Sequence, residues 1–432
     1  MRLVTAHELD HPARERLLAE LHARPAPRVS APARAVHLAL KESRYAANRD
    51  READRALMRT LAEATAEPDE SPRHTEFDVV GYRVVWENHT EYAAYTACRH
   101  LADGLAAEPF AEDPRTLFPD EWLDGAPARR LAAVIVEVRP MPPEPEHIPT
   151  LVHRWFSSPP VISSVLGGAG VLTGNLVPDD DGYTRWVLFV DPSVGPGRTG
   201  RTLQRLFDLE TYRMLALLGF DRSHGLSAQL NELDPDLTDL ITAMDDPAHS
   251  AEEMLHELLA LTSRLEGLAM SSQFRFGATS AYASIVEDRL ASLAEERFLG
   301  RQTLAELLTR RYVPAIRTAQ SAEERLDRML ERSRRAAELL RTRLDVARSA
   351  ENQQLLVSMD RRADLQLRLQ TTVEGLSVIA VSYYLLGLLG YVLAPVAEST
   401  GVDKTWLLAA LAPLVVLVVW LGLRRVTRRI GH

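Results

Sequence analysis

The sequence predicts an α+β membrane protein with an N-terminal cytoplasmic α/β domain, a long helical stalk and a C-terminal two-helix transmembrane hairpin. Three observations predict this fold class. Residues 1–222 mix β-branched runs with helical patterns, residues 315–372 form one uninterrupted helical pattern, and two apolar segments follow. A length of 432 residues is enough for two or three domains.

The α/β domain is expected over residues 1–222, with a sub-boundary near the proline-rich stretch at 141–150. Its strand-like runs are rich in Val, Ile, Thr and aromatic residues, and Gly81 marks a turn within one of them. The expected strands cover residues 34–40, 74–98, 131–140, 161–166, 168–177 and 184–191. Residues 223–314 show a helical pattern and are expected to form a separate helical region.

The stalk helix is expected over residues 315–372, because Pro314 precedes it and the next glycine is Gly375. Its apolar positions alternate at spacings of four and three, as in a coiled-coil seam. The seam residues are Leu326, Leu330, Ala337, Leu340, Leu344 and Ala347, with Ser333 at the one polar position. Such a stalk is roughly 87 Å long at about 1.5 Å per residue. The alternative is an ordinary amphipathic helix packed on the domain.

A transmembrane hairpin is expected over residues 373–423. Residues 375–397 carry no charge, residues 406–423 carry none either, and the loop 398–404 joins them. A helix needs about 20 apolar residues to span the hydrocarbon core of a bilayer. A buried hairpin in a soluble core is the alternative, but the second segment has no polar face to turn to water.

The charges beside the two spans predict their orientation. Arginines precede the first span at Arg361, Arg362 and Arg368, and follow the second in the basic tail 424–432 at Arg424, Arg425, Arg428 and Arg429. The connecting loop holds a single lysine, Lys404, beside acidic residues. Because basic residues favour the cytoplasmic side, both termini are expected in the cytoplasm.

Composition excludes several classes of protein. The net charge of −10 argues against a nucleic-acid partner, since such proteins are usually basic. A single cysteine, Cys98, leaves no intrachain disulfide and no cysteine-based zinc site. The first residues hold no apolar run of the signal-peptide type. No arrangement for nucleophilic catalysis stands out, so we expect no enzyme.

One face of the first apolar segment is polar. Gln370, Glu374, Ser377, Tyr384 and Tyr391 follow each other at spacings built from threes and fours, and therefore share a helix face. Polar groups in a bilayer need polar partners or water, and the second segment offers none. Several copies are therefore expected around a shared polar axis or pore. The alternative is that the aromatic residues belong to the interfacial belt and Glu374 to the membrane surface.

Acidic residues flank the two ends of this polar axis. Glu374 is placed to form a carboxylate ring at the cytoplasmic mouth, and Glu398 and Asp403 are placed to form rings at the outer mouth. Rings of carboxylates concentrate cations.

A metal site is a weaker candidate. The tripeptide HTE occurs at 74–76 and again at 89–91. If the strands pair around Gly81, His74 and His89 face each other, and Glu91 is close enough to complete a divalent metal site. The alternative is that these histidines are structural.

A phosphate-binding loop is the weakest candidate. The stretch VGPGRTGRT at 194–202 follows a strand and precedes a helix, with Gly195, Gly200 and Thr202 at the positions such a loop requires. Arg201 stands in place of the lysine, and a bulky guanidinium does not readily replace a flexible point charge. A glycine turn between strand and helix is the default interpretation.

Five stretches together resemble one family. They are ELHARP at 20–25, APARAVHLAL at 31–40, WENHTEY at 86–92, ETYRMLALLG at 210–219 and LQTTVEGLSVIAVSYYLLGLLGY at 369–391. They resemble the bacterial predicted membrane-anchored proteins of the domain of unknown function 3422, over nearly the whole chain. The resemblance implies a multi-pass protein of the bacterial inner membrane, and it brings no established activity.

The order of elements also resembles the CorA-type magnesium transporters. Those proteins have a cytoplasmic α/β domain, a stalk helix that becomes the first membrane helix, a short outer loop, a second membrane helix and a basic tail. They form pentamers in which the first helix lines the pore. Their Gly-Met-Asn signature is absent here, and the nearest match is Gly390-Tyr391. The likeness is one of architecture, which does not by itself imply function.

Two functions therefore remain open. The first is an oligomeric, CorA-like ion channel or transporter with the lipid bilayer and its own copies, five by the resemblance, as partners. The residues identify no cofactor, and the resemblance implies a divalent cation such as Mg²⁺. The second is a membrane-anchored cytoplasmic scaffold or sensor without transport. An enzyme on a membrane anchor has no support beyond the weak loop at 194–202.

Overall fold

The computed structural model describes residues 11, 14, 26–43, 49–62, 74–101, 108–246, 248–394 and 403–430. The chain forms two compact units, residues 1–245 with 257–336 and residues 246–256 with 337–432. The first unit holds a β-sheet and the helices that cover it, and the second holds two apolar helical segments near the C-terminus. The expected α+β class is therefore confirmed.

The elements follow in chain order. The strands are β1 (Ala33–Lys41), β2 (His74–Val79), β3 (Tyr82–Asn88), β4 (Tyr92–His100), β5 (Arg129–Pro140), β6 (Val161–Val165), β7 (Gly170–Pro178), β8 (Thr184–Val190) and β9 (Glu296–Arg297). The helices are α2 (Arg51–Ala62), α3 (Asp120–Asp124), α4 (Ile148–Val152), α5 (Pro196–Ala243), α6 (Ala251–Leu293), α7 (Leu304–Val392) and α9 (Lys404–Ile430), with 3₁₀ helices η2 (Pro114–Thr116), η3 (Pro145–His147) and η4 (Leu166–Gly168).

Within the described residues the strands form one mixed sheet of nine strands, in the order β2-β3-β4-β1-β5-β8-β7-β6-β9. Neighbours pair antiparallel except β5 and β8, which are parallel. The turn expected at Gly81 is present. Val79 pairs with Tyr82, and both Val80 and Gly81 have positive φ, as a two-residue hairpin loop requires.

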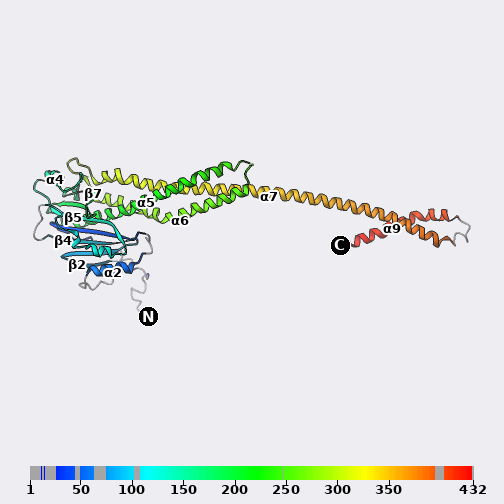
Figure 1. The fold of residues 1–432 in the computed structure, drawn as a ribbon, viewed down its shortest axis with the longest axis horizontal. Coiled ribbons are helices and arrows are strands. Elements are labelled where there is room, and N and C mark those ends of the chain that lie inside the picture. The colour runs from blue at the N-terminus through cyan, green and yellow to red at the C-terminus, as the bar shows by residue number, and fades with distance from the viewer. Residues whose placement is uncertain are drawn as a thin grey trace, which may run out of the picture. The chain divides into compact units, whose positions relative to one another are not determined.

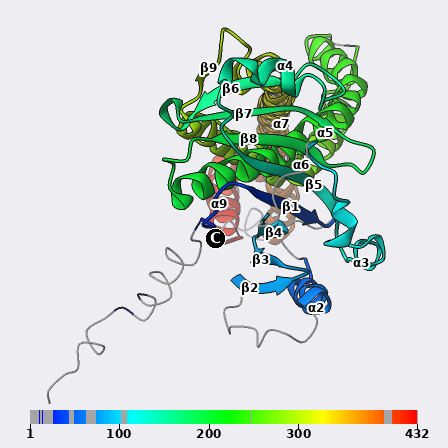
Figure 2. The same ribbon diagram turned by 90° about the vertical axis from the view of Figure 1, so that its left-hand side faces the viewer.

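Alternation along the strands separates two cores. On β1, Ala33 and Ala35 face a core built with α5, α6 and the first turns of α7, while Val36 and Leu38 face a core that includes α2. Figures 1 and 2 show α5 and α6 along one face of the sheet and α2 beside β2 and β3. A strand whose side chains are apolar on both faces must be covered on both sides, and β1 lies inside the sheet between β4 and β5.

Two expected boundaries lie inside continuous structure. The stretch at 141–150 contains η3 and begins α4, whose Ile148 is buried, and the sheet continues across it because β5 pairs directly with β8. The expected boundary at residue 222 falls within α5, which runs from Pro196 to Ala243 without a break.

The long helix α7 begins at Leu304, eleven residues before the expected start at residue 315, and Pro314 lies inside it. A proline inside a helix costs about 3 kcal/mol because it removes a backbone hydrogen bond and crowds the preceding turn. Leu304, Leu308 and Ile316 are buried in the core on the sheet, and their burial offsets this cost.

The seam of α7 packs against helices of its own chain. Leu326, Leu330 and Ser333 are buried. The Ser333 hydroxyl lies 2.5 Å from that of Thr262 on α6, and Arg325 donates to Asp234 of α5 at 2.9 Å. The first part of α7 is therefore an amphipathic helix packed on neighbouring helices of the same chain, which was the alternative given for the seam.

In the second unit α7 becomes progressively more exposed, because fewer neighbouring side chains pack against it. Leu340 is buried, Ala337 and Leu344 are half-buried, and Ala347 is exposed. Arg348 still pairs with Glu252 at 2.7 Å. Beyond this pair α7 has exposed residues on all sides as far as residue 373.

Candidate functional site: the polar stripe of the apolar hairpin

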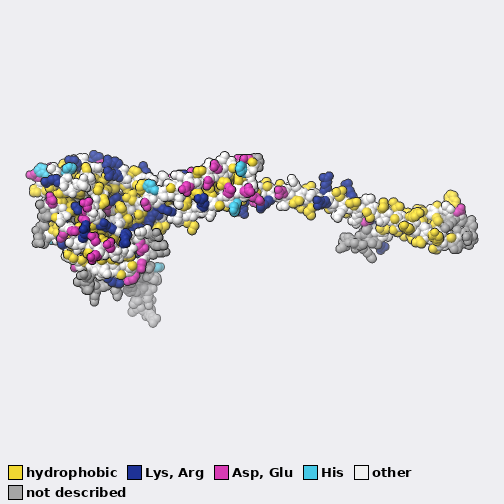
Figure 3. All heavy atoms as spheres, in the orientation of Figure 1, with side chains coloured by type: hydrophobic (Ala, Val, Ile, Leu, Met, Phe, Trp, Pro, Cys, Tyr) yellow, Lys and Arg dark blue, Asp and Glu magenta, His cyan; other side chains and the backbone are white. Residues whose placement is uncertain are grey.

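Two helical segments are long and apolar enough to cross a membrane, the end of α7 and residues Thr405–Arg425 of α9, and only 11% of each apolar window is buried. Figure 3 shows hydrophobic side chains gathered along both segments. Expected spans at 375–397 and 406–423 agree with these helices where residues are described. Pro413 lies within α9.

The two helices touch along one face of each. On α7, Ser382 is 3% exposed and Gly390 is buried, while on α9 Val415 and Val419 are buried at a spacing of four. Small side chains on α7 allow the close approach of α9. Sequence reasoning did not single out Ser382, although a serine and a glycine eight residues apart fall on one side of a helix.

The polar stripe lies on a different face of α7. Two residues along a helix correspond to a rotation of about 200°, so Tyr384 projects about 160° away from Ser382. Tyr384 is 73% exposed and Tyr391 is 80% exposed. Ser377, which is half-buried, donates to the carbonyl oxygen of Val373 at 2.8 Å. The spacing predicted a shared face, and both tyrosines on that face remain largely exposed although it borders α9.

A groove of about 540 Å³ opens where this face meets α9. Its lining includes Tyr383, Tyr384, Gly387 and Tyr391 on α7 and Leu408 on α9. The rings of Tyr383 and Tyr384 stand edge to face, with centroids 6.1 Å apart. The groove is thus lined by apolar groups and by three aromatic rings that carry hydroxyl groups.

Acidic groups stand near the ends of the stripe. At one end Glu374 accepts a hydrogen bond from Gln370 at 3.3 Å, one helical turn away. At the other end Asp403 accepts from the backbone amide and the hydroxyl of Thr405, at 3.0 and 2.9 Å. These bonds lower the pKa of Asp403 and cap the start of α9. Glu398 lies outside the described residues.

The expected histidine pair does not form. The register of β2 and β3 places His74 opposite Glu87, and His89 lies beyond the end of β3, where its ring stacks on Tyr92 at 4.2 Å. Glu91 is bound to protein groups instead. Among the described residues no group of three His, Cys, Asp or Glu side chains is placed to hold a metal ion. The two-residue loop at Val80 and Gly81 sets this register. The two HTE tripeptides therefore do not lie opposite each other, although they repeat in the sequence.

The stretch 194–202 does not wrap around a phosphate site. The helix α5 starts at Pro196 with Gly195 as its N-cap, so Gly200 and Thr202 lie inside the first turns. A Cβ on Gly200 would lie 1.5 Å from the carbonyl oxygen of Pro27. Gly200 is therefore explained by contact between two backbones, and the buried Thr202 donates to the carbonyl of Arg198 at 3.2 Å.

A buried polar cluster joins the sheet to α6. Glu91 is 2% exposed and accepts hydrogen bonds from Arg275 at 2.6 Å and from the Tyr282 hydroxyl at 2.8 Å. Burial, and then the Glu91 charge, raise the pKa of Tyr282, which keeps its proton. Burial, and then the charge of Arg275, lower the pKa of Lys41 on the neighbouring strand. Glu91 is therefore a structural anchor for α6.

A second polar contact joins the sheet to α5. His37 on β1 is buried, with Nδ1 2.8 Å from the Thr96 hydroxyl on β4 and Nε2 2.9 Å from the Thr211 hydroxyl on α5. Its ring stacks on Phe207 at 4.9 Å. Burial lowers the pKa of His37 to about 3, so the imidazole stays neutral.

A sequence model of the DUF3422 family, described as proteins of unknown function, matches residues 9–430. The chain belongs to the DUF3422 family. No curated protein matches it. The comparison adds no site residue to the DUF3422 chain, so its candidate site depends on the geometry above.

Segments that carried the resemblance meet in the DUF3422 fold. The stretch 31–40 forms most of β1, the stretch 86–92 joins β3 to β4, and the stretch 210–219 lies in α5. His37 and Thr211 are hydrogen-bonded across two of these stretches. This polar contact therefore joins the sheet to α5 through residues of two of these stretches.

Proposed function

We propose that the DUF3422 chain is an oligomeric membrane protein that conducts or transports a divalent cation, such as Mg²⁺, along an axis lined by the apolar part of α7. One observation carries the proposal, namely that Tyr384 and Tyr391 stay largely exposed on one face of α7 after α9 has packed against it. Polar groups facing lipid cost free energy. Several copies of α7 with this face turned inward remove the cost.

In this proposal both apolar helices cross the bacterial inner membrane. Arg361, Arg362 and Arg368 precede the first helix and a basic segment follows the second, so both termini lie in the cytoplasm. A cysteine replacing Asp403, at the start of α9, is expected to react with an impermeant thiol reagent added outside the cell. Labelling only from the cytoplasmic side contradicts the hairpin.

The order of elements supports a CorA-like architecture. A sheet domain precedes two long helices, α5 and α6, and the single helix α7 continues into the first apolar segment before α9. The absence of a Gly-Met-Asn signature means that the proposal includes no selectivity filter of that family's kind.

The proposed cation site needs several copies of the chain. The described residues of one chain contain no metal-binding cluster, and Glu374 brings one carboxylate at the end of the stripe. In a symmetric oligomer each copy adds a carboxylate at the same depth. Such rings attract cations, and their mutual repulsion favours cation binding.

Cysteine crosslinking tests the shared axis. The background is Cys98→Ala, which removes the one native thiol. Single cysteines are introduced at three positions on the stripe. Three control cysteines are introduced at exposed positions on other faces of α7. The stripe positions are 377, 384 and 391, and the controls are 376, 379 and 383. Crosslinks between copies are expected at the stripe alone, and equal yields at all six contradict a shared axis.

Ion flux into vesicles tests conduction. Glu374→Gln is expected to reduce divalent-cation uptake, because the variant removes the charge and keeps the shape. Glu351→Gln is the matched control on the exposed part of α7. If crosslinks form at the stripe but the wild-type protein neither passes nor binds divalent cations, the chain is an oligomer and the transport proposal is wrong.

A membrane-anchored scaffold or sensor is the second candidate. The observation that favours it is the packing of Leu326 and Leu330 against helices of the same chain, which takes that part of the seam away from other copies. A monomer by native mass spectrometry in detergent, with no stripe crosslinks in membranes, selects this candidate over the channel.

A further inference from the structure

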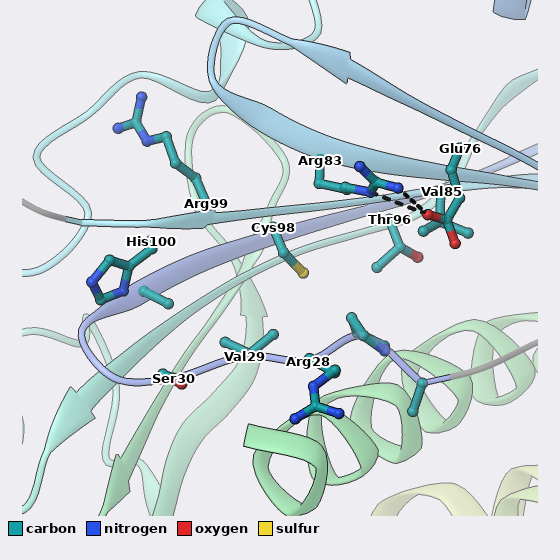
Figure 4. A pocket seen from close by; sticks show the side chains of 13 residues that line it. Arg28, Val29, Ser30, Glu76, Arg83, Val85, Thr96, Cys98, Arg99 and His100 are labelled. Atoms are coloured by element: carbon teal, nitrogen blue, oxygen red, sulfur yellow. Dashed lines mark hydrogen bonds and ion pairs between the residues drawn. The ribbon is translucent and has the colours of Figure 1, made fainter. Parts of the chain in front are cut away.

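A groove of about 390 Å³ lies between the segment 26–30 and the face of β3 and β4 on the α5 side of the sheet. Figure 4 shows Cys98 pointing into this space, with Val29 and Arg28 on the opposite wall. The volume falls at the small end of the range of about 300–1,000 Å³ for small-molecule sites.

The wall of the groove is fixed by α5. The Val29 amide donates to the carbonyl of Pro196 at 3.1 Å, and the Pro27 carbonyl fills the space that a side chain at Gly200 would occupy. The Val29 side chain is buried in the core. These contacts hold the segment in place, so the groove is preformed.

The floor of the groove is apolar. Val85 and Ala33 contribute aliphatic groups, and burial raises the pKa of the Cys98 thiol to about 12, which keeps it neutral. The Thr96 hydroxyl is already engaged by His37 at 2.8 Å. The floor therefore favours an apolar body over a polar one.

The rim of the groove carries a net positive charge. Arg28 and His100 are exposed, and within the described residues no ion pair involves Arg28. Arg83 and Glu76 neutralise each other at 2.7 Å, as Figure 4 shows. Arg99 turns its guanidinium to the other face of the sheet, where it binds Glu112 at 2.6 Å. Arg28 is thus the rim cation that no ion pair within the described residues neutralises, and its exposed side chain can turn to the groove from the α5 side, where Figure 4 draws its guanidinium.

We propose that this groove binds a small organic anion, a compact apolar body that carries one carboxylate or phosphate. The apolar body lies on Val85 and Cys98, and the anionic group meets Arg28 at the rim. A guanidinium is well suited to carboxylate and phosphate because it donates two parallel hydrogen bonds. The site is separate from the hairpin and does not depend on transport.

Cys98 provides the reporter, because it is the one cysteine of the chain. Alkylation of the full-length protein by N-ethylmaleimide is followed by intact mass, with 2-naphthoate as the probe and neutral 2-naphthamide as its match. Naphthoate is expected to slow alkylation in a saturable manner, and naphthamide is expected to have little effect. Equal protection by both compounds, or none by naphthoate, overturns the proposal.

Two variants test the assigned roles. Arg28→Ala is expected to weaken naphthoate protection about tenfold, the value of one charge-assisted hydrogen bond, while Arg310→Ala, exposed on α7, leaves it unchanged. Val85→Trp fills the groove and is expected to abolish naphthoate binding in equilibrium dialysis at an unchanged melting temperature. Undiminished binding in Arg28→Ala overturns the proposal even if Val85→Trp fails to fold.

Discussion

The buried His37 makes the stability of the sheet depend on pH. The pKa of His37 is lowered from 6.5 to about 3 by burial, so the folded chain leaves this imidazole neutral at pH 5. In the unfolded chain the imidazole binds a proton as the pH falls through 6.5. Between these two values the unfolded state holds more protons, and the free energy of unfolding therefore rises with pH.

The size of the effect follows from the shift. At pH 5 the solution is about 1.5 units below the ordinary histidine pKa, and each unit is worth about 1.36 kcal/mol. His37 should therefore cost the fold about 2 kcal/mol between pH 7 and pH 5. Its contribution is fully present above pH 6.5 and is lost as the pH falls toward about 3.

Urea unfolding of the full chain, followed by tryptophan fluorescence, measures this term. Trp86 and Trp186 are buried in the sheet and report its unfolding. His37→Gln keeps a neutral hydrogen-bonding group, and its stability is expected to fall about 2 kcal/mol less than that of the wild type between pH 7 and pH 5. His147→Gln, at an exposed histidine, is the control. Equal pH dependence in His37→Gln and the wild type refutes a neutral, buried His37.

Three further variants test the packing. Arg275→Ala leaves a buried glutamate without its cation and should destabilise the sheet by about 3–5 kcal/mol in the same urea assay. Leu330→Asp buries a charge and should lower the melting temperature sharply, whereas Leu339→Asp, at an exposed position, should not. Gly200→Ala should destabilise through its clash, although alanine in a helix normally stabilises by up to about 1 kcal/mol, and Gly195→Ala, with open space around it, should be tolerated. Unchanged melting in Gly200→Ala refutes the backbone contact.

Local patterns predicted much of the fold. The alternating run on β1, the turn at Gly81 and the two apolar helices are all set by nearest neighbours in the sequence. The parallel pairing of β5 with β8 is not set by local sequence, because it joins residues about 50 positions apart. The proline-rich stretch between them was therefore interpreted as a boundary. Pro314 was interpreted as the start of the long helix for a similar reason. The contacts that offset the cost of a proline inside α7 are made in the core on the sheet, far away in the sequence.

The candidate site was predictable in part. The spacing of Glu374, Tyr384 and Tyr391 placed them on one helix face, and the exposure of the two tyrosines beside α9 is a structural result. Which side α9 covers depends on Ser382 and Val415, which no periodicity distinguishes from other small or apolar residues. The anchoring role of Glu91 was not foreseen, because its partner Arg275 lies 184 residues away.

That separation has a consequence for synthesis on the ribosome. Arg275 leaves the exit tunnel 184 residues after Glu91, a delay of about 10 to 40 s at the usual rate of roughly 5–20 residues per second. Until then Glu91 lacks its hydrogen-bonded arginine, and the link from the β3–β4 turn to α6 is not formed. Both apolar helices are still unmade at that moment. The nascent chain thus forms the contact between Glu91 and Arg275 only when α6 emerges, and this still happens before its two apolar segments emerge.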